Sequence, residues 1–245
     1  MTQAQPTPPT PPQRPPMNLT RMLRVWFLLV LSMAVVAILC LAAMPQRPPR
    51  EPPKGSGPEA ADDPLATLVW PTDMTPSSRW RFVILHHTAT PSATLEAITR
   101  YHRDHLNVEG TAYHFLIHNG RAAGTRDGQI EPTPRWLAQQ DGAHCYVQGH
   151  PEYSRRGIGV CLVGHFGQEE PTPAQMASLT RLVNLLRRRY DMPLEHVLRH
   201  GELKETECPG QKFPMEALVM QLRRAHLEDE GPPTGPADTT GPDDD

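Results

Sequence analysis

Two histidines and one cysteine have the chemistry and the placement to hold a metal ion. His86 follows the apolar run FVIL, His200 follows the short stretch VLR, and Cys208 lies eight residues after His200 in HGELKETECPG. Two imidazoles and one thiolate suit zinc, and three protein ligands leave a fourth tetrahedral position for water, as in catalytic zinc sites. The absence of a CxxC pair from the sequence argues against a zinc finger. A histidine at a strand end is more often structural or solvated, so spacing alone leaves both interpretations open.

The first element that must position these residues is the strand that ends in His86. Residues 82–85 are apolar and rich in β-branched and aromatic side chains, which is typical of a buried strand. Successive strand residues point to opposite faces, so at most one of His86 and His87 can face a given site.

Other segments predict further strands and helices. Strands are predicted over residues 112–117, 157–163 and 195–199, and Asn119-Gly120 favours a two-residue hairpin turn after the first of them. Thr172, followed by Pro173 and Gln175, has the pattern of a capping box and predicts the start of a helix. Two more helices are predicted over 92–105 and 215–227. Strands interleaved with helices indicate an α/β fold with a central mixed β-sheet flanked by helices.

Both ends of the chain have a composition that cannot form a core. Roughly half of the 29 prolines precede residue 65, and the last fifteen residues are mostly Pro, Gly, Thr and Asp. We therefore expect a disordered tail over residues 1–21, a Pro-rich linker over 45–66, one domain over 67–228 and an acidic disordered tail over 229–245. The formal net charge of −3 gives no reason to expect nucleic acid as a partner.

Residues 22–44 contain an apolar stretch. The run from Val25 to Met44 has no charged residue, and as a helix it would roughly match the ~30 Å hydrocarbon layer. We interpret it as an uncleaved transmembrane helix preceding the folded domain. The alternative is a cleaved signal peptide, for which Leu41-Ala42-Ala43 offers small residues. Basic residues flank both ends, so the positive-inside rule leaves the orientation open.

The motifs, taken in order, resemble a known family. VILHHTAT, GTAYHFLIHNGR, GIGVCLVG, PTPAQMASLTRLV and RHGELKETECPG together span nearly all of residues 80–215. In order and separation they are similar to the zinc amidase family that includes type 2 N-acetylmuramoyl-L-alanine amidases, peptidoglycan recognition proteins and amidase-type phage lysozymes. The resemblance implies a single catalytic domain that uses zinc to hydrolyse the amide between the lactyl group of N-acetylmuramic acid and L-alanine in peptidoglycan.

The resemblance also implies roles for individual residues. His86, His200 and Cys208 match the zinc ligands, which leaves His87 pointing away. Tyr113 and Thr206 match catalytic positions, where a phenol and a hydroxyl could donate to the oxyanion of the tetrahedral intermediate. His114 and His144 match positions that line the substrate groove, although a histidine on a strand is as often structural.

An alternative function and several consequences follow from the same resemblance. Some relatives bind muropeptides without cleaving them, and these commonly lose the cysteine ligand that is present here as Cys208. Because peptidoglycan lies outside the cytoplasmic membrane, we expect the domain on the periplasmic side, anchored through residues 22–44 or secreted if that segment is cleaved. We also expect a monomer.

Cys145 and Cys161 could pair in an oxidising compartment, but Cys161 lies in an apolar strand, which favours a buried free thiol.

Overall fold

The computed structural model describes residues 26–30, 32–33 and 63–230, and the chain divides into two compact units, residues 1–52 and 53–245. In the first unit the described residues are helical. Within the described ranges, no helix combines the length and the apolar character needed to cross a bilayer. The predicted membrane segment 22–44 lies mostly outside the described residues, as do both predicted tails and most of the predicted linker.

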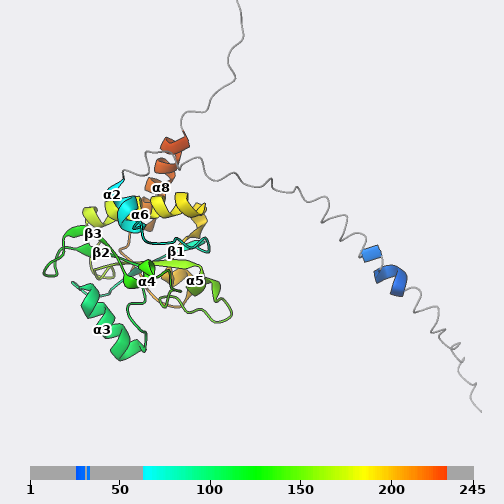
Figure 1. Ribbon diagram of the computed structural model, residues 1–245, viewed down its shortest axis with the longest axis horizontal. Coiled ribbons are helices and arrows are strands. Elements are labelled where there is room, and N and C mark those ends of the chain that lie inside the picture. Colours follow the sequence, from blue (N-terminus) through cyan, green and yellow to red (C-terminus); the bar gives the residue numbers. More distant parts are fainter. Residues whose placement is uncertain (1–25, 31, 34–62, 231–245) are drawn as a thin grey trace, which may run out of the picture. The chain divides into compact units, whose positions relative to one another are not determined.

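A five-stranded mixed sheet forms the centre of the second unit, in the strand order β3-β2-β4-β1-β5 (Figure 1). Its strands are β1 (Phe82–His87), β2 (Phe115–Asn119), β3 (Asp127–Pro132), β4 (Gly157–Leu162) and β5 (Val197–Arg199). The pairs β2 with β4, β4 with β1 and β1 with β5 are parallel, whereas β3 is antiparallel to β2. The prediction of an α/β fold with a central mixed sheet is therefore confirmed.

Three helices pack on one face of this sheet: α2 (Pro64–Val69), α6 (Pro173–Tyr190) and α8 (Met215–Glu230) (Figure 1). The core between them contains Val83, Leu85, Phe115, Ile117, Ile158, Val160 and Leu162 from the strands, and Leu179, Leu182, Val183, Leu186, Leu218 and Leu222 from α6 and α8. The helix α6 begins as predicted. Thr172 Oγ1 accepts from the Gln175 N–H at 3.0 Å, and Gln175 Oε1 accepts from the Thr172 N–H at 3.1 Å, which completes the capping box.

The opposite face carries α3 (Leu95–Leu106), where Ile98 packs against Leu116 and Cys161 of the sheet. The remaining helical segments are short: α4 (Pro134–Leu137), α5 (Glu152–Arg155), the 3-10 helix η2 (Leu194–His196) and α7 (His200–Leu203). Neighbouring residues of parallel strands point to the same face, and His86 pairs with Cys161. The side chain of His86 therefore points to the α3 face.

Some element boundaries differ from those predicted. The helix α2 starts at Pro64, ahead of the predicted domain boundary at 67, because Asp63 caps it and its Leu65 and Val69 are buried in the core. The helix α3 starts at Leu95 rather than 92, since Thr94 accepts from the Ala97 N–H and acts as the cap.

The predicted strand 112–117 and its two-residue turn also change. The carbonyls of Glu109 and Thr111 accept hydrogen bonds from the guanidinium of Arg135, and β2 begins only at Phe115. Asn119 pairs with Asp127, so residues 120–126 form a longer loop and the prediction of a two-residue hairpin is wrong. The Asn119 side chain instead donates to Pro91 O at 2.8 Å.

Candidate metal centre

Strand register brings His86 and His200 side by side. Val83, Ile84 and Leu85 of β1 pair in parallel with Val197, Leu198 and Arg199 of β5. The residue that follows each matched run is a histidine, and the two imidazole centroids are 4.6 Å apart. Because parallel strands end at the same edge of a sheet, two residues distant in sequence deliver their rings to one place.

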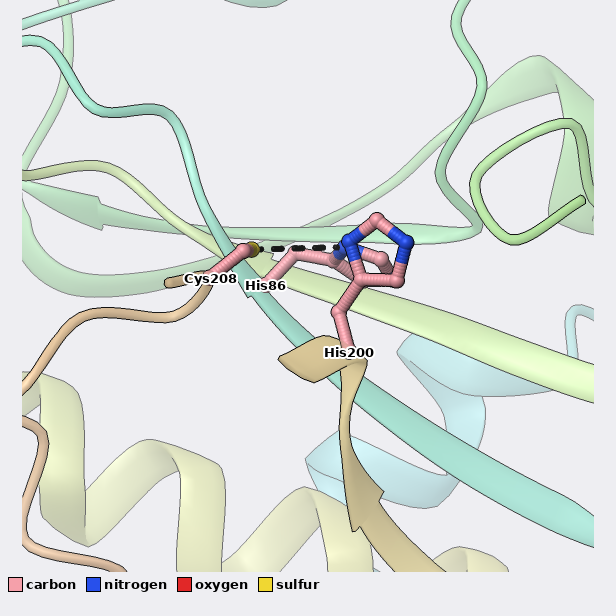
Figure 2. A group of neighbouring side chains, drawn as sticks. All are labelled: His86, His200 and Cys208. Carbon is pink, nitrogen blue, oxygen red and sulfur yellow. Dashed lines mark hydrogen bonds between the residues drawn. The ribbon is translucent and has the colours of Figure 1, made fainter. Parts of the chain in front are cut away.

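Cys208 reaches the same place through the loop that follows α7. The Gly201 N–H donates to Cys208 O at 2.8 Å, which ties the end of the loop to its beginning. A Cβ on Gly201 would lie 2.6 Å from Thr206 O, so the close approach of the loop requires glycine at this position. Figure 2 shows the resulting arrangement, with the thiol of Cys208 beside the two rings.

The three candidate ligand atoms are close enough for one ion. All of them lie within 4.8 Å of one another, and Cys208 Sγ is 3.7 Å from His86 Nδ1 (Figure 2). A tetrahedral zinc ion, with bonds of about 2.1 Å to nitrogen and 2.3 Å to sulfur, would hold such a pair about 3.6 Å apart. The buried Nε2 of His200 has no hydrogen-bond partner among the described residues. The donor set and its spacing fit zinc, while metal binding itself stays a prediction.

Burial sets the protonation of these groups. It lowers the pKa of His86 well below its ordinary value, helped by the neighbouring His144 and His200 rings. Burial lowers the pKa of His200 to about 4 and raises the pKa of the Cys208 thiol to about 11. Both imidazoles are therefore neutral at pH 7 and can offer a lone pair, whereas the thiol must lose its proton when it binds a cation.

His87 points to the other face of the sheet, as strand alternation predicts. Its Nδ1 accepts from the Phe166 N–H at 3.1 Å, and its ring lies 5.8 Å from the ring of Phe166 in the main core. It is not part of the ligand cluster formed by His86, His200 and Cys208.

Tyr113 lies beside the cluster. Its ring centroid is 5.2 Å from that of His86 and 5.3 Å from that of His102. Burial and the neighbouring thiols of Cys161 and Cys208 raise the pKa of Tyr113 well above its ordinary value. The phenol is thus a hydrogen-bond donor at neutral pH, next to the candidate ligands.

Thr206 lies on the loop that carries Cys208. Its Oγ1 accepts from the Cys208 N–H at 3.3 Å, and its side chain is exposed. Thr206 and Cys208 both line a hollow of about 210 Å³, with Arg199 and Glu207 on its walls.

His114 and His144, the two residues predicted to line the substrate groove, are both buried. His114 is fully buried, its Nδ1 accepts from the Gly159 N–H at 2.9 Å, and its Nε2 lies 3.1 Å from Gln140 O. His144 is 8% exposed, and its Nδ1 lies 3.0 Å from His86 Nε2. The assignment of either residue to substrate binding stays a prediction. The link from His144 to His86 was not predicted, because the two residues are far apart in sequence.

The two cysteines that could have paired are free. Cys145 and Cys161 are both buried and form no disulfide. Burial raises the pKa of both thiols, that of Cys145 to about 11. The interpretation of Cys161 as a small buried apolar residue is confirmed, since it packs with Ile98 and Leu116.

Comparison with known proteins identifies the family. The family model described as N-acetylmuramoyl-L-alanine amidase (Amidase_2) matches residues 76–211, which include β1, the Cys208 loop and everything between them. The chain belongs to this family. The resemblance inferred from the motifs is therefore confirmed.

Some relatives of this chain are named as amidases and others as peptidoglycan recognition proteins. A peptidoglycan recognition protein of Trichoplusia ni is 28% identical over 151 residues, which are 58% of this chain and 72% of that protein. An N-acetylmuramoyl-L-alanine amidase of Sus scrofa is 25% identical over 154 residues, covering 58% of this chain and 23% of the relative. Among solved structures, the N-acetylmuramoyl-L-alanine amidase LysC of Clostridium intestinale is 30% identical with a TM-score of 0.49, over 61% of this chain and 91% of LysC.

Proposed function

We propose that this amidase family member is a zinc-dependent N-acetylmuramoyl-L-alanine amidase, which cleaves the bond between the lactyl group of N-acetylmuramic acid and L-alanine of the stem peptide. The observation that carries the proposal is the complete ligand cluster of His86, His200 and Cys208, whose three donor atoms lie within 4.8 Å of one another. The cysteine matters most, because a recognition module has no chemical need for a third ligand beside an open position.

The side chains around the cluster have the properties that amide hydrolysis needs. A bound zinc ion would polarise the amide carbonyl and lower the pKa of water toward ~7. Tyr113 would donate its hydroxyl proton in a hydrogen bond to the developing oxyanion, since its raised pKa keeps the phenol protonated. Thr206, exposed on the wall of the hollow beside Cys208, would orient the substrate carbonyl with its hydroxyl.

The test is mass spectrometry of the products after the full-length protein is incubated with defined muropeptides, comparing the native protein with Cys208→Ser. Release of free stem peptide beginning at L-alanine by the native protein alone supports the proposal. Intact muropeptide from both proteins, with zinc bound to the native form, would instead favour a muropeptide recognition module. Several relatives carry the name peptidoglycan recognition protein, so this second function has support of its own.

The location of the enzyme follows from its proposed substrate. Because peptidoglycan lies outside the cytoplasmic membrane, we propose that residues 63–230 work on the periplasmic side. Residues 22–44 would serve as the membrane anchor, and the Pro-rich stretch up to about residue 62 would act as a tether that limits the working radius. Protease protection of the full-length protein in intact cells and after outer-membrane permeabilisation tests this: cleavage of the domain only after permeabilisation supports it, and protection in both cases contradicts it.

A further inference from the structure

We infer that His144 is a positioning residue, which sets the tautomer of His86 and thereby selects Nδ1 as the metal-binding nitrogen. The inference rests on the metal centre of the proposed function and does not depend on the hydrolytic reaction. It starts from a chain of three groups: His86 Nε2 lies 3.0 Å from His144 Nδ1, and His144 Nε2 lies 3.3 Å from Gly157 O.

The carbonyl at the end of this chain determines where each proton lies. A backbone carbonyl can only accept a hydrogen bond, so the proton of neutral His144 must be on Nε2, which donates to Gly157 O. Its Nδ1 is then a bare acceptor. Consequently, the His86 proton lies on Nε2 and is donated to His144. The remaining nitrogen, His86 Nδ1, keeps its lone pair.

This lone pair faces the candidate metal position. His86 Nδ1 is the nitrogen that lies 3.7 Å from Cys208 Sγ (Figure 2). With the opposite tautomer, a proton would occupy the position at which the ion binds, and the buried Nδ1 of His144 would lose its donor. A hydrogen bond to the distal nitrogen of a metal-binding histidine holds the ring orientation and raises ligand basicity.

The ring of His144 packs closely against the backbone of two glycines. Gly142 and Gly159 both lie against the imidazole, and a Cβ on either residue would overlap it. The ring stands nearly perpendicular to the neighbouring rings of His86 and His114, at interplanar angles of 75° and 77°. The ring of His144 thus packs directly against two glycines and two imidazoles, which restricts its rotation.

Two substitutions of His144 each preserve one of its two hydrogen bonds and remove the other. In His144→Asn the side-chain oxygen can take the place of Nδ1 and accept from His86, whereas in His144→Gln the side-chain nitrogen can take the place of Nε2 and donate to Gly157 only. His118→Gln is the matched control, because His118 is also buried and makes a side-chain hydrogen bond, to Glu131 at 2.6 Å, outside the ligand cluster.

The measurement is the zinc dissociation constant of each full-length variant, obtained by competition with a chromophoric chelator. We expect zinc binding to weaken about 10- to 100-fold in His144→Gln, by only a few fold in His144→Asn, and to stay unchanged in His118→Gln. Equal zinc affinity in His144→Gln and the native protein would overturn the inference, as would an equal loss in the Asn and Gln variants.

A second measurement needs no substitution and no metal. Long-range ¹H–¹⁵N correlation spectra of the native, zinc-free protein report the tautomer of each histidine, and we expect the Nε2–H form for both His86 and His144. An Nδ1–H form of His86 would overturn the inference even if a variant fails to fold. If the native protein fails to bind zinc, the proposed metal centre is wrong. The spectra would still show which tautomer His86 adopts.

Discussion

The imidazoles of His86 and His200 lie 4.6 Å apart because the last residues before them, Leu85 and Arg199, are paired in parallel register. A shift of one residue between β1 and β5 would move one ring to the other face of the sheet. The ligand cluster of His86, His200 and Cys208 therefore depends on the pairing of a three-residue edge strand, β5.

The two adjacent histidines of β1 should respond differently to substitution. We expect His86→Ala to abolish tight zinc binding, since it removes one of three ligands. His87→Ala should keep zinc and lose about 1 to 3 kcal/mol of unfolding free energy, because it leaves the Phe166 N–H without its acceptor and removes the ring that lies beside Phe166. Metal content after dialysis and urea unfolding distinguish the two. Zinc loss in His87→Ala would contradict the assignment of its side chain to the opposite face.

Tyr113→Phe should reduce turnover and leave the metal in place. The substitution removes one hydroxyl donor beside the ligand cluster, and loss of a single oxyanion donor lowers kcat about 10²- to 10³-fold. Steady-state kinetics with a defined muropeptide, together with zinc content, measures both effects. Tyr101→Phe is the matched control, because Tyr101 is 55% exposed on α3. Full activity of Tyr113→Phe would remove this residue from the proposed mechanism.

Gly201→Ala should weaken zinc binding, although Gly201 is not one of the candidate metal ligands. The new Cβ would lie 2.6 Å from Thr206 O and 3.1 Å from Cys208 O, so the loop that presents the thiol would have to shift. We expect about a tenfold rise in the zinc dissociation constant, by analogy with the loss of a supporting contact. Glu205→Ala, an exposed change in the same loop, serves as control. Unchanged zinc affinity in Gly201→Ala would show that the loop tolerates the displacement.

The zinc-free protein should lose stability in mild acid. Burial lowers the pKa of His114 well below 6.5 and that of His144 to about 3, so in this range the unfolded chain binds protons that the folded protein excludes. Stability is therefore complete above about pH 6.5 and falls as the pH drops toward about 3, by up to ~1.4 kcal/mol per pH unit for each such histidine.

Urea unfolding of the zinc-free protein at several pH values between 7 and 5 measures this slope. His114→Asn keeps an acceptor for the Gly159 N–H and removes one titrating group, so its slope should be shallower than that of the native protein. A slope that is the same in both proteins would show that His114 does not contribute to the acid sensitivity.

Much of the fold was accessible from local patterns. The capping box of Thr172 and Gln175 depends on residues three positions apart, and the apolar runs of β1 and β4 depend on neighbours in sequence. The same local rule predicted that His86 and His87 point to opposite faces. The two-residue turn at Asn119-Gly120 did not form, because Asn119 pairs with Asp127 at the far end of a longer loop.

The sequence by itself determined the set of chemical groups: two histidines and a cysteine at the ends of predicted elements, in an order that identified the family. Only the tertiary structure decided that His86 Nδ1 faces Cys208 and that His86 Nε2 faces His144. Strand alternation depends on the backbone of one segment, so it can be read locally. The partner of each ring nitrogen depends on strand register and on which segments are packed together, and those are set by burial of the whole core.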